Sequence, residues 1–273
     1  MIKIGKKPLI MGILNVTPDS FSDGGKFFSI EDAVKHAIQM EKDGADIIDI
    51  GGESTRPGSK SISLKEERKR VIPVVENLID KIKIPISIDT YKSEIAKESL
   101  DIGASMINDI TALRGDDKLA EVVAEYDVPI CLMHMKGTPK NMQVNPEYDD
   151  VVDEIKDFLK ERSEYAVSKG IKNKNIIIDP GLGFGKRTGK GIDDNLEILN
   201  RLPELKELGY PILVGGSRKT FVGYFFGEGK LLSVDQRLEG SLAAAIIAIA
   251  NGANIIRVHD VKETRNVIGF VES

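Results

Sequence analysis

The chain has 273 residues, of which 41% are hydrophobic and 30% are charged, and its formal net charge is −5. This length is near the roughly 250 residues of one α/β barrel, and the composition excludes a disordered or fibrous chain. The negative charge argues weakly against a nucleic-acid partner, and the single cysteine excludes an internal disulfide. No apolar stretch reaches the roughly 20 residues of a membrane span, and the N-terminus has no secretory signal pattern. We therefore expect a cytoplasmic protein without a membrane partner.

Eight short apolar segments predict parallel strands, because both faces of each segment are apolar, as in strands that helices cover on both sides. Helices are expected between them. Ser63 and Glu66 form a capping-box pattern, and residues 149–168 place apolar side chains on one face. The unbroken alternation favours a (β/α)8 TIM barrel that forms a single α/β domain over residues 1–273, with a doubly wound open sheet as the alternative. The expected strands are residues 9–14, 46–50, 85–89, 105–109, 129–133, 175–179, 211–215 and 254–258.

The first two strands lead into loops whose residues suit ligand binding. Residues 15–25 are long for a βα connection and include Phe21, which a plain turn would not need, so we expect a mobile lid. Residues 51–58 combine paired glycines with the Thr55 hydroxyl and the Arg56 guanidinium, a fork that suits a carboxylate or phosphate. Each loop alone could be a solvated turn. Function is favoured because both loops lie at one rim.

Three further strands end in side chains that accept hydrogen bonds, namely Asp89, Asn108 and Asp179. A lone aspartate at such a position is most often a helix cap, as Asp89 could be. Gathered at one barrel mouth, these groups suit the donor edge of a flat nitrogen heterocycle such as a 2-aminopyrimidinone. A metal held by the two aspartates is less favoured, since the chain has only three histidines.

Segments after the last three strands complete the expected site. Residues 181–186 differ in spacing from a dinucleotide fingerprint, and we interpret them as a flexible glycine loop with Phe184 as a flat wall. Ser217 and Lys219 are expected to open a helix, and a helix N-terminus is a natural anion site. Arg257 and His259, alternate residues at the eighth strand, add positive charge where barrels usually bind phosphate.

Together these motifs resemble the dihydropteroate synthase family, and the resemblance runs from Met11 to Arg265. It implies a transferase of folate biosynthesis and a sulfonamide target. Such an enzyme joins 6-hydroxymethyl-7,8-dihydropterin diphosphate to 4-aminobenzoate, with Mg²⁺ as cofactor, and yields 7,8-dihydropteroate and diphosphate. The motifs that carry the resemblance are residues 11–25, 51–58, 88–90, 107–109, 179–186, 217–219 and 257–261.

The resemblance also implies a role for each matching residue. The catalytic set would be Asp89, Asp179, Lys219, Arg257 and His259. The pterin would bind Asp89, Asn108 and Asp179, with Lys219 and Arg257 beside it. The diphosphate would bind Asn15, Thr55, Arg56, Arg257 and His259, and Asn15 would contact Mg²⁺. The aminobenzoate would be framed by Phe21, Pro57, Phe184, Ser217 and Lys219.

Two other enzymes remain as alternatives, and a non-enzymatic binding role is the least favoured. A related pterin-binding module presents methyltetrahydrofolate to a corrinoid, and Phe21 and Arg56 argue against it because it should lack the two loops. A Schiff-base aldolase would use Lys219, and borohydride trapping would identify it. Residues 242–250 are apolar on more than one face, which indicates a homodimer surface unless this helix is buried within the monomer.

Overall fold

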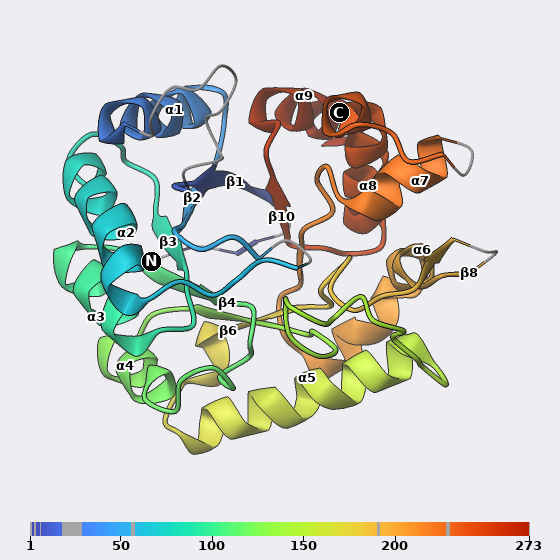
Figure 1. Cartoon of the computed structure of the whole chain (residues 1–273), viewed down its shortest axis with the longest axis horizontal. Coiled ribbons are helices and arrows are strands. Elements are labelled where there is room, and N and C mark those ends of the chain that lie inside the picture. Colours follow the sequence, from blue (N-terminus) through green and yellow to red (C-terminus); the bar gives the residue numbers. More distant parts are fainter. Residues whose placement is uncertain are drawn as a thin grey trace.

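The computed structural model describes residues 2, 4–5, 7–17, 29–55, 58–189, 192–227 and 230–272, and they form the expected (β/α)8 barrel. Eight parallel strands follow the order β6-β5-β4-β3-β2-β1-β10-β9. A parallel bridge between Ile178 and Ile212 joins the two ends of this sheet, which closes the barrel and excludes an open sheet (Figure 1). The strands are β1 (Leu9–Asn15), β2 (Ile47–Gly51), β3 (Ile86–Asp89), β4 (Met106–Asp109), β5 (Ile130–Met133), β6 (Ile176–Asp179), β9 (Leu213–Val214) and β10 (Ile255–Val258).

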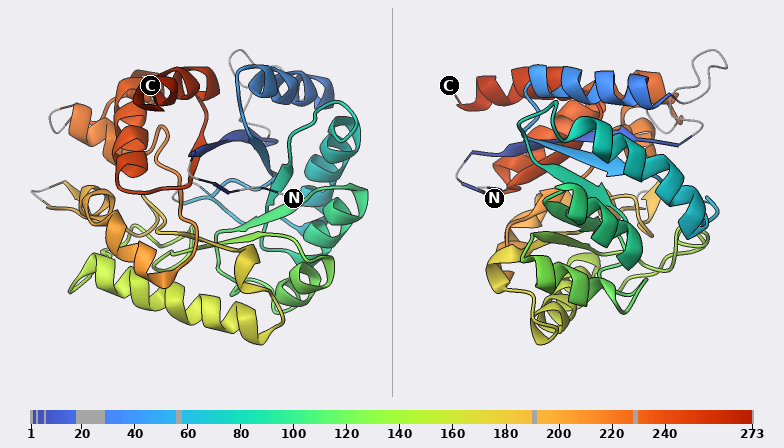
Figure 2. Two further views of the ribbon diagram at one scale, coloured as in Figure 1. Left: turned by 180° about the vertical axis from the view of Figure 1, so that it is seen from behind. Right: turned by 90° about the vertical axis from the view of Figure 1, so that its left-hand side faces the viewer.

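Helices alternate with the strands and surround the barrel (Figures 1 and 2). A separate antiparallel pair, β7 (Thr188–Gly189) and β8 (Ile192–Asp193), follows β6. Within the described residues, no helix has both the length and the apolar character to cross a membrane. The helices are α1 (Ile30–Lys42), α2 (Leu64–Leu78), α3 (Ser93–Ile102), α4 (Leu119–Tyr126), α5 (Val151–Ser168), α6 (Asp194–Asn200), α7 (Thr220–Phe226), α8 (Leu238–Ala250) and α9 (Val261–Glu272).

Local sequence signals set the ends of these elements. Ser63 caps α2, where its hydroxyl accepts the Glu66 amide at 3.2 Å. The Glu66 carboxylate pairs with Arg70 at 2.8 Å, so the expected capping box is only half formed. The predicted strands are confirmed with ends shifted by at most two residues. From β2 onward each strand begins one or two residues later than predicted, because the link that precedes it takes up the first predicted position.

The barrel interior is built in layers, because alternate residues of each strand point inward. The inward-facing side chains nearer the start of the strands are apolar and include Met11, Ile47, Met106, Cys131, Ile177, Leu213 and Ile255. Two residues further along β2, β4, β6 and β10, the same face carries polar side chains. These four strands alternate around the barrel, and four side chains from alternate strands form one layer of such a barrel. We call this set the polar layer: Asp49, Asn108, Asp179 and Arg257.

Candidate active site

A cavity of about 1150 Å³ opens where the strands end. Asn108 and Asp179 do not line it directly but lie in the polar layer, where they are 4% and 6% exposed. Phe21, Arg56 and Pro57 fall outside the described residues, as do residues 18–25 of the predicted lid. The cavity brings together the other predicted site residues: Asn15, Thr55, Asp89, Phe184, Ser217, Lys219, Arg257 and His259.

Arg257 joins the polar layer to Asp89. Its Nε donates to Oδ2 of Asp49 at 2.6 Å, and its Nη2 donates to Oδ2 of Asp89 at 2.8 Å. The Nδ2 of Asn108 donates to the same Asp49 oxygen at 2.9 Å. Burial raises the pKa of Asp89 to about 7, although the Arg257 guanidinium lowers it. Two carboxylates thus hold one cation, and one of them also accepts from an amide.

Asp179 ends β6 and brings a second predicted carboxylate to the site. Its Oδ1 accepts the Gly181 backbone amide at 2.7 Å. Among the described residues, no other donor forms a hydrogen bond with this side chain, so Oδ2 can accept from a ligand. Burial raises the pKa of Asp179, while the Lys219 cation lowers it.

Lys219 immediately precedes α7 and places its amine beside an aromatic ring. Its Nζ donates to the Leu182 carbonyl and lies 4.4 Å from the centre of the Phe184 ring. Burial lowers the pKa of Lys219 to about 8, while the Asp179 carboxylate raises it. A cation above a flat ring, close to a carboxylate, suits a planar ligand that also carries negative charge.

Ser217 and His259 form a pair at the wall that Arg257 shares. The Ser217 hydroxyl accepts the His259 backbone amide at 3.2 Å and lies 3.0 Å from Nδ1 of the ring. Either the hydroxyl proton or the ring proton joins this pair, according to the tautomer of the imidazole. Arg218 also lines the cavity, but its charge is paired, because its Nε donates to Asp260 at 2.9 Å. The imidazole and the guanidinium together suit an anion.

A buried lysine holds the glycine-rich loop after β6. The Nζ of Lys186 donates to the carbonyls of Gly181 and Phe184 and contacts Nδ1 of His134, each at 3.0 Å. Gly181 has a φ of +70°, and a side chain there would meet the His134 carbonyl oxygen at 1.9 Å. Burial lowers the pKa of Lys186 to about 7. The loop is therefore packed and hydrogen-bonded, which corrects the expectation of a flexible glycine loop.

Sequence patterns do not reveal two of these residues. Asp49 lies within the apolar run of β2, and its side chain is fully buried. A charged residue in such a run, two places after an inward-facing position, is a signal that could have identified it. Lys186 is the last residue of a glycine motif, and no local pattern indicates that it is buried.

The described part of the chain contains no group of three or more His, Cys, Asp or Glu side chains that could hold a metal ion. Asn15 ends β1 and lines the cavity. Mg²⁺ takes oxygen ligands and commonly binds through one or two protein groups together with substrate phosphates. The donors present therefore fit Mg²⁺ bound with a phosphorylated ligand better than a preformed metal cage.

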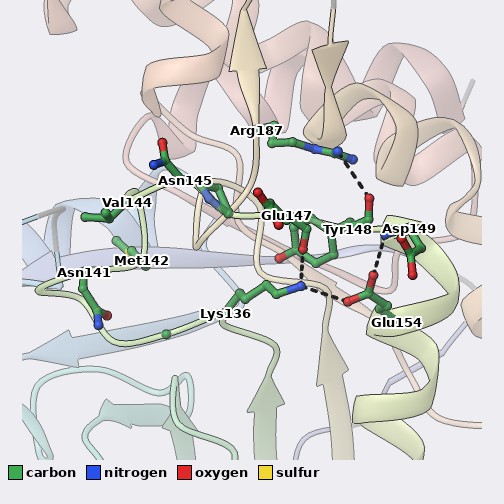
Figure 3. A pocket seen from close by; sticks show the side chains of 12 residues that line it. Lys136, Asn141, Met142, Val144, Asn145, Glu147, Tyr148, Asp149, Glu154 and Arg187 are labelled. Atoms are coloured by element: carbon green, nitrogen blue, oxygen red, sulfur yellow. Dashed lines mark hydrogen bonds and ion pairs between the residues drawn. The ribbon is translucent and has the colours of Figure 1, made fainter.

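A second cavity, of about 840 Å³, shares the segment from Met142 to Glu147 with the first (Figure 3). Its two basic side chains are both paired with carboxylates. Lys136 lies 3.0 Å from Glu154, and Arg187 lies 2.9 Å from Asp194. Because these charges are already neutralised, we place the candidate active site in the larger cavity.

Comparison with known proteins gives this geometry a context. Residues 11–259 match the family model described as pterin binding enzyme. Dihydropteroate synthase of Escherichia coli is 49% identical over 266 residues, which cover 97% of this chain and 91% of that protein. Dihydropteroate synthase of Yersinia pestis, solved as a sulfonamide drug complex, has a TM-score of 0.90 and 46% identity over 97% of this chain and 94% of that chain. The Xanthomonas albilineans enzyme in complex with 7,8-dihydropteroate has a TM-score of 0.85 and 42% identity over 97% and 93%.

Proposed function

The chain belongs to the dihydropteroate synthase family of pterin-binding enzymes, and on that premise we propose that it joins 6-hydroxymethyl-7,8-dihydropterin diphosphate to 4-aminobenzoate. The bond between the pterin methylene carbon and the diphosphate oxygen breaks, and a carbon–nitrogen bond to the arylamine forms. The amine loses one proton, and the products are 7,8-dihydropteroate and diphosphate. The observation that carries the proposal is that Asp89, Lys219, Arg257 and His259 line one cavity at the ends of the strands, next to the buried polar layer.

Asp89, Asn108 and Asp179 bind the pterin ring. A pterin offers N–H donors along one edge, and hydrogen bonds to charged acceptors are stronger than bonds between neutral groups. Oδ2 of Asp179 has no donor from the described residues and suits this role. Lys219 and Arg257 lie beside the ring, where Asp49 and Asp89 hold the Arg257 guanidinium in place.

Arg257, His259, Thr55 and Asn15 hold the diphosphate, and these four residues line the cavity. Arg56 was predicted to join them and lies outside the described residues. When bound, Mg²⁺ supplies positive charge to the diphosphate oxygens, and Asn15 would be its protein ligand. The cations of the cavity wall stabilise the diphosphate oxygen that gains negative charge as the carbon–oxygen bond breaks. Electrostatic stabilisation has its largest effect on charge that develops in the transition state.

The aminobenzoate lies against Phe184, Ser217 and Lys219. Phe184 supplies a flat apolar surface, and its position is fixed by the Lys186 bond to its carbonyl. Lys219 adds a positive charge that suits the benzoate carboxylate. Phe21 and Pro57, the other two predicted contacts, lie outside the described residues.

This arrangement explains how the reaction proceeds without a strong general base. The electron-rich dihydropterin can stabilise positive charge at its methylene carbon, and Asp89 and Asp179 add fixed negative charge near the ring. Departure of diphosphate therefore creates a cation that the site stabilises. An arylamine is a sufficient nucleophile for such a cation, and its proton is lost after the new bond has formed.

A coupled assay of diphosphate release tests the function. With the pterin diphosphate as substrate, release should depend on 4-aminobenzoate, and 7,8-dihydropteroate should form in equal amount. Release that does not depend on the arylamine would contradict the proposal. Trapping of Lys219 by borohydride in the presence of a carbonyl substrate would instead support the Schiff-base aldolase.

We also propose that the chain is one cytoplasmic domain that forms a homodimer through α7 and α8. The lone cysteine, Cys131, is buried and unpaired, as in proteins of reducing compartments. Helix α8 contains the apolar segment 242–250, and its residues Ala244, Ala245 and Ala248 are buried. This helix is therefore partly a core element of the monomer. The exposed apolar side chains lie mostly next to it: Tyr224, Phe225, Phe226, Leu231, Val234 and Ile247.

Sedimentation of the wild type and of a Phe225→Asp variant tests this dimer. Phe225 is 59% exposed, so an aspartate there should cost the monomer little and should be unfavourable in an apolar interface. A monomeric wild type, or a variant that still forms the dimer at micromolar concentration, would contradict the assignment of this face.

A further inference from the structure

Asp49 is the member of the polar layer to which the family resemblance assigns no role. The other three members, Asn108, Asp179 and Arg257, belong to the proposed pterin site. Asp49 reaches the same layer from β2, and its side chain is fully buried. One of its oxygens, Oδ2, accepts both from Arg257 at 2.6 Å and from Asn108 at 2.9 Å.

Stability alone does not account for this carboxylate. Taking a charged pair out of water costs several kcal/mol per ion, and apolar residues of similar size are often equally or more stabilising. The second oxygen, Oδ1, is buried and has no hydrogen-bond partner among the described residues, which adds a desolvation cost. The role of the Asp49 carboxylate therefore lies in its effect on neighbouring side chains.

The first effect is on the amide of Asn108. An amide presents a donor on one side and an acceptor on the other, whereas an ionised carboxylate only accepts. Asp49 therefore selects the orientation in which Nδ2 of Asn108 faces β2. The amide oxygen is then left as an acceptor for a ligand N–H.

The second effect is on Arg257. Asp49 binds its Nε and Asp89 binds its Nη2, so two carboxylates on neighbouring strands fix the plane of the guanidinium. A guanidinium held at two of its nitrogens has few orientations left. The entropic cost of ordering it is therefore incurred on folding and not on substrate binding.

We propose that Asp49 is a positioning residue that sets pterin affinity by orienting Asn108 and Arg257. This inference rests on the proposed function of the cavity. Asp49 acts on the pterin half of the site, and the aminobenzoate contacts at Phe184 and Ser217 do not depend on it.

The test compares Asp49→Asn with the wild type and with Ser87→Ala. Ser87 is the β3 neighbour of Asp49 in the sheet register, is fully buried, and has an Oγ without a partner among the described residues. It therefore controls for loss of a buried polar group in the same region. Asp49→Ser, which is smaller and also uncharged, serves as a second variant if Asp49→Asn does not fold.

In Asp49→Asn, the Kd of a pterin fragment and the KM for the pterin diphosphate should both rise roughly 10-fold to 150-fold, the factor for one hydrogen bond to a charged group. At saturating pterin, the KM for the arylamine substrate should change less than about twofold, and Ser87→Ala should change neither value. Mere loss of folded enzyme would lower kcat and leave both KM values unchanged.

A double-mutant cycle with Asn108→Ala shows whether Asp49 acts through the amide, because coupled residues give non-additive effects. Asp49→Asn should then weaken pterin binding by a smaller factor than it does in the wild type. An equal factor in both backgrounds, an unchanged pterin Kd, or a parallel rise of both KM values would overturn the inference. A wild type that binds no pterin would instead overturn the proposed function.

Discussion

Replacement of Asp179 by asparagine separates the chemistry of the pterin site from the stability of the barrel. Oδ1 of Asp179 accepts the Gly181 amide at 2.7 Å, and an asparagine oxygen can take over that bond. The new NH₂ group then stands where Oδ2 faced the ligand. A donor would replace a charged acceptor opposite the N–H groups of the pterin, while the fold of the loop would be retained.

The expected loss follows from a single hydrogen bond. A bond to a charged group contributes about 1.5–3 kcal/mol, which corresponds to a roughly 10-fold to 150-fold rise in Kd. The new NH₂ group and the pterin N–H groups would be donors that face each other, which weakens binding further. The lower end of the range is therefore a minimum. The free energy of unfolding should change little, because the Gly181 bond remains and a buried charge is removed.

Asp109→Asn is the matched control. Asp109 is also a fully buried carboxylate at a strand end, but its oxygens accept from the Thr111 amide and hydroxyl, both at 2.7 Å, and from the Leu113 amide at 2.6 Å. This substitution should lower the Tm and leave the pterin Kd unchanged. Calorimetry with 6-hydroxymethylpterin and thermal unfolding of both variants provide the two readings. An Asp179→Asn enzyme that binds the pterin as tightly as the wild type would refute the assignment of this carboxylate.

Three further predictions concern pH, metal and substrate order. The profile of kcat/KM for the pterin diphosphate should be bell-shaped, because burial raises the pKa of Asp89 to about 7 and lowers that of Lys219 to about 8. Asp89 thus loses charge as the pH falls through about 7, Lys219 loses charge as the pH rises past about 8, and a flat profile would contradict both roles. Mg²⁺ should bind tightly only with diphosphate present, since the described residues form no cage for it; stoichiometric binding to the enzyme alone in a titration would show otherwise. Both 4-aminobenzoate and sulfonamides should bind poorly until pterin and diphosphate are in place, and titrations that give equal affinity in both states would exclude an ordered site.

The strands and the position of the site could be predicted from the sequence because both depend on local patterns. Apolar runs bounded by glycine links mark the strands, and parallel strands bring their last residues to one rim. Asp89 and Asp179 stand at the ends of such runs, so their convergence follows from the fold class alone.

The missing parts depend on contacts between distant segments. Arg257 and Asp49 are 208 residues apart in the chain, and no pattern around Asp49 indicates its partner. Lys186 is buried because His134 and two backbone carbonyls surround it, which only the packed loop reveals. The exposed aromatics of α7 do not stand out in the sequence, because α8 is more hydrophobic although it is partly a core helix.

The polar layer also limits how this enzyme can vary over generations. Its four side chains belong to the inner wall of the barrel, directly next to apolar side chains, so a replacement that changes side-chain volume there alters both the packing of the barrel and the proposed pterin site. Exposed loop residues at the larger cavity, such as Gln143 and Glu147, are not part of this packed interior, so neutral substitutions can accumulate there. Resistance to an inhibitor that contacts exposed loop residues can therefore arise through substitutions that cost little folding stability. Resistance to an inhibitor that contacts the polar layer requires substitutions in the barrel interior.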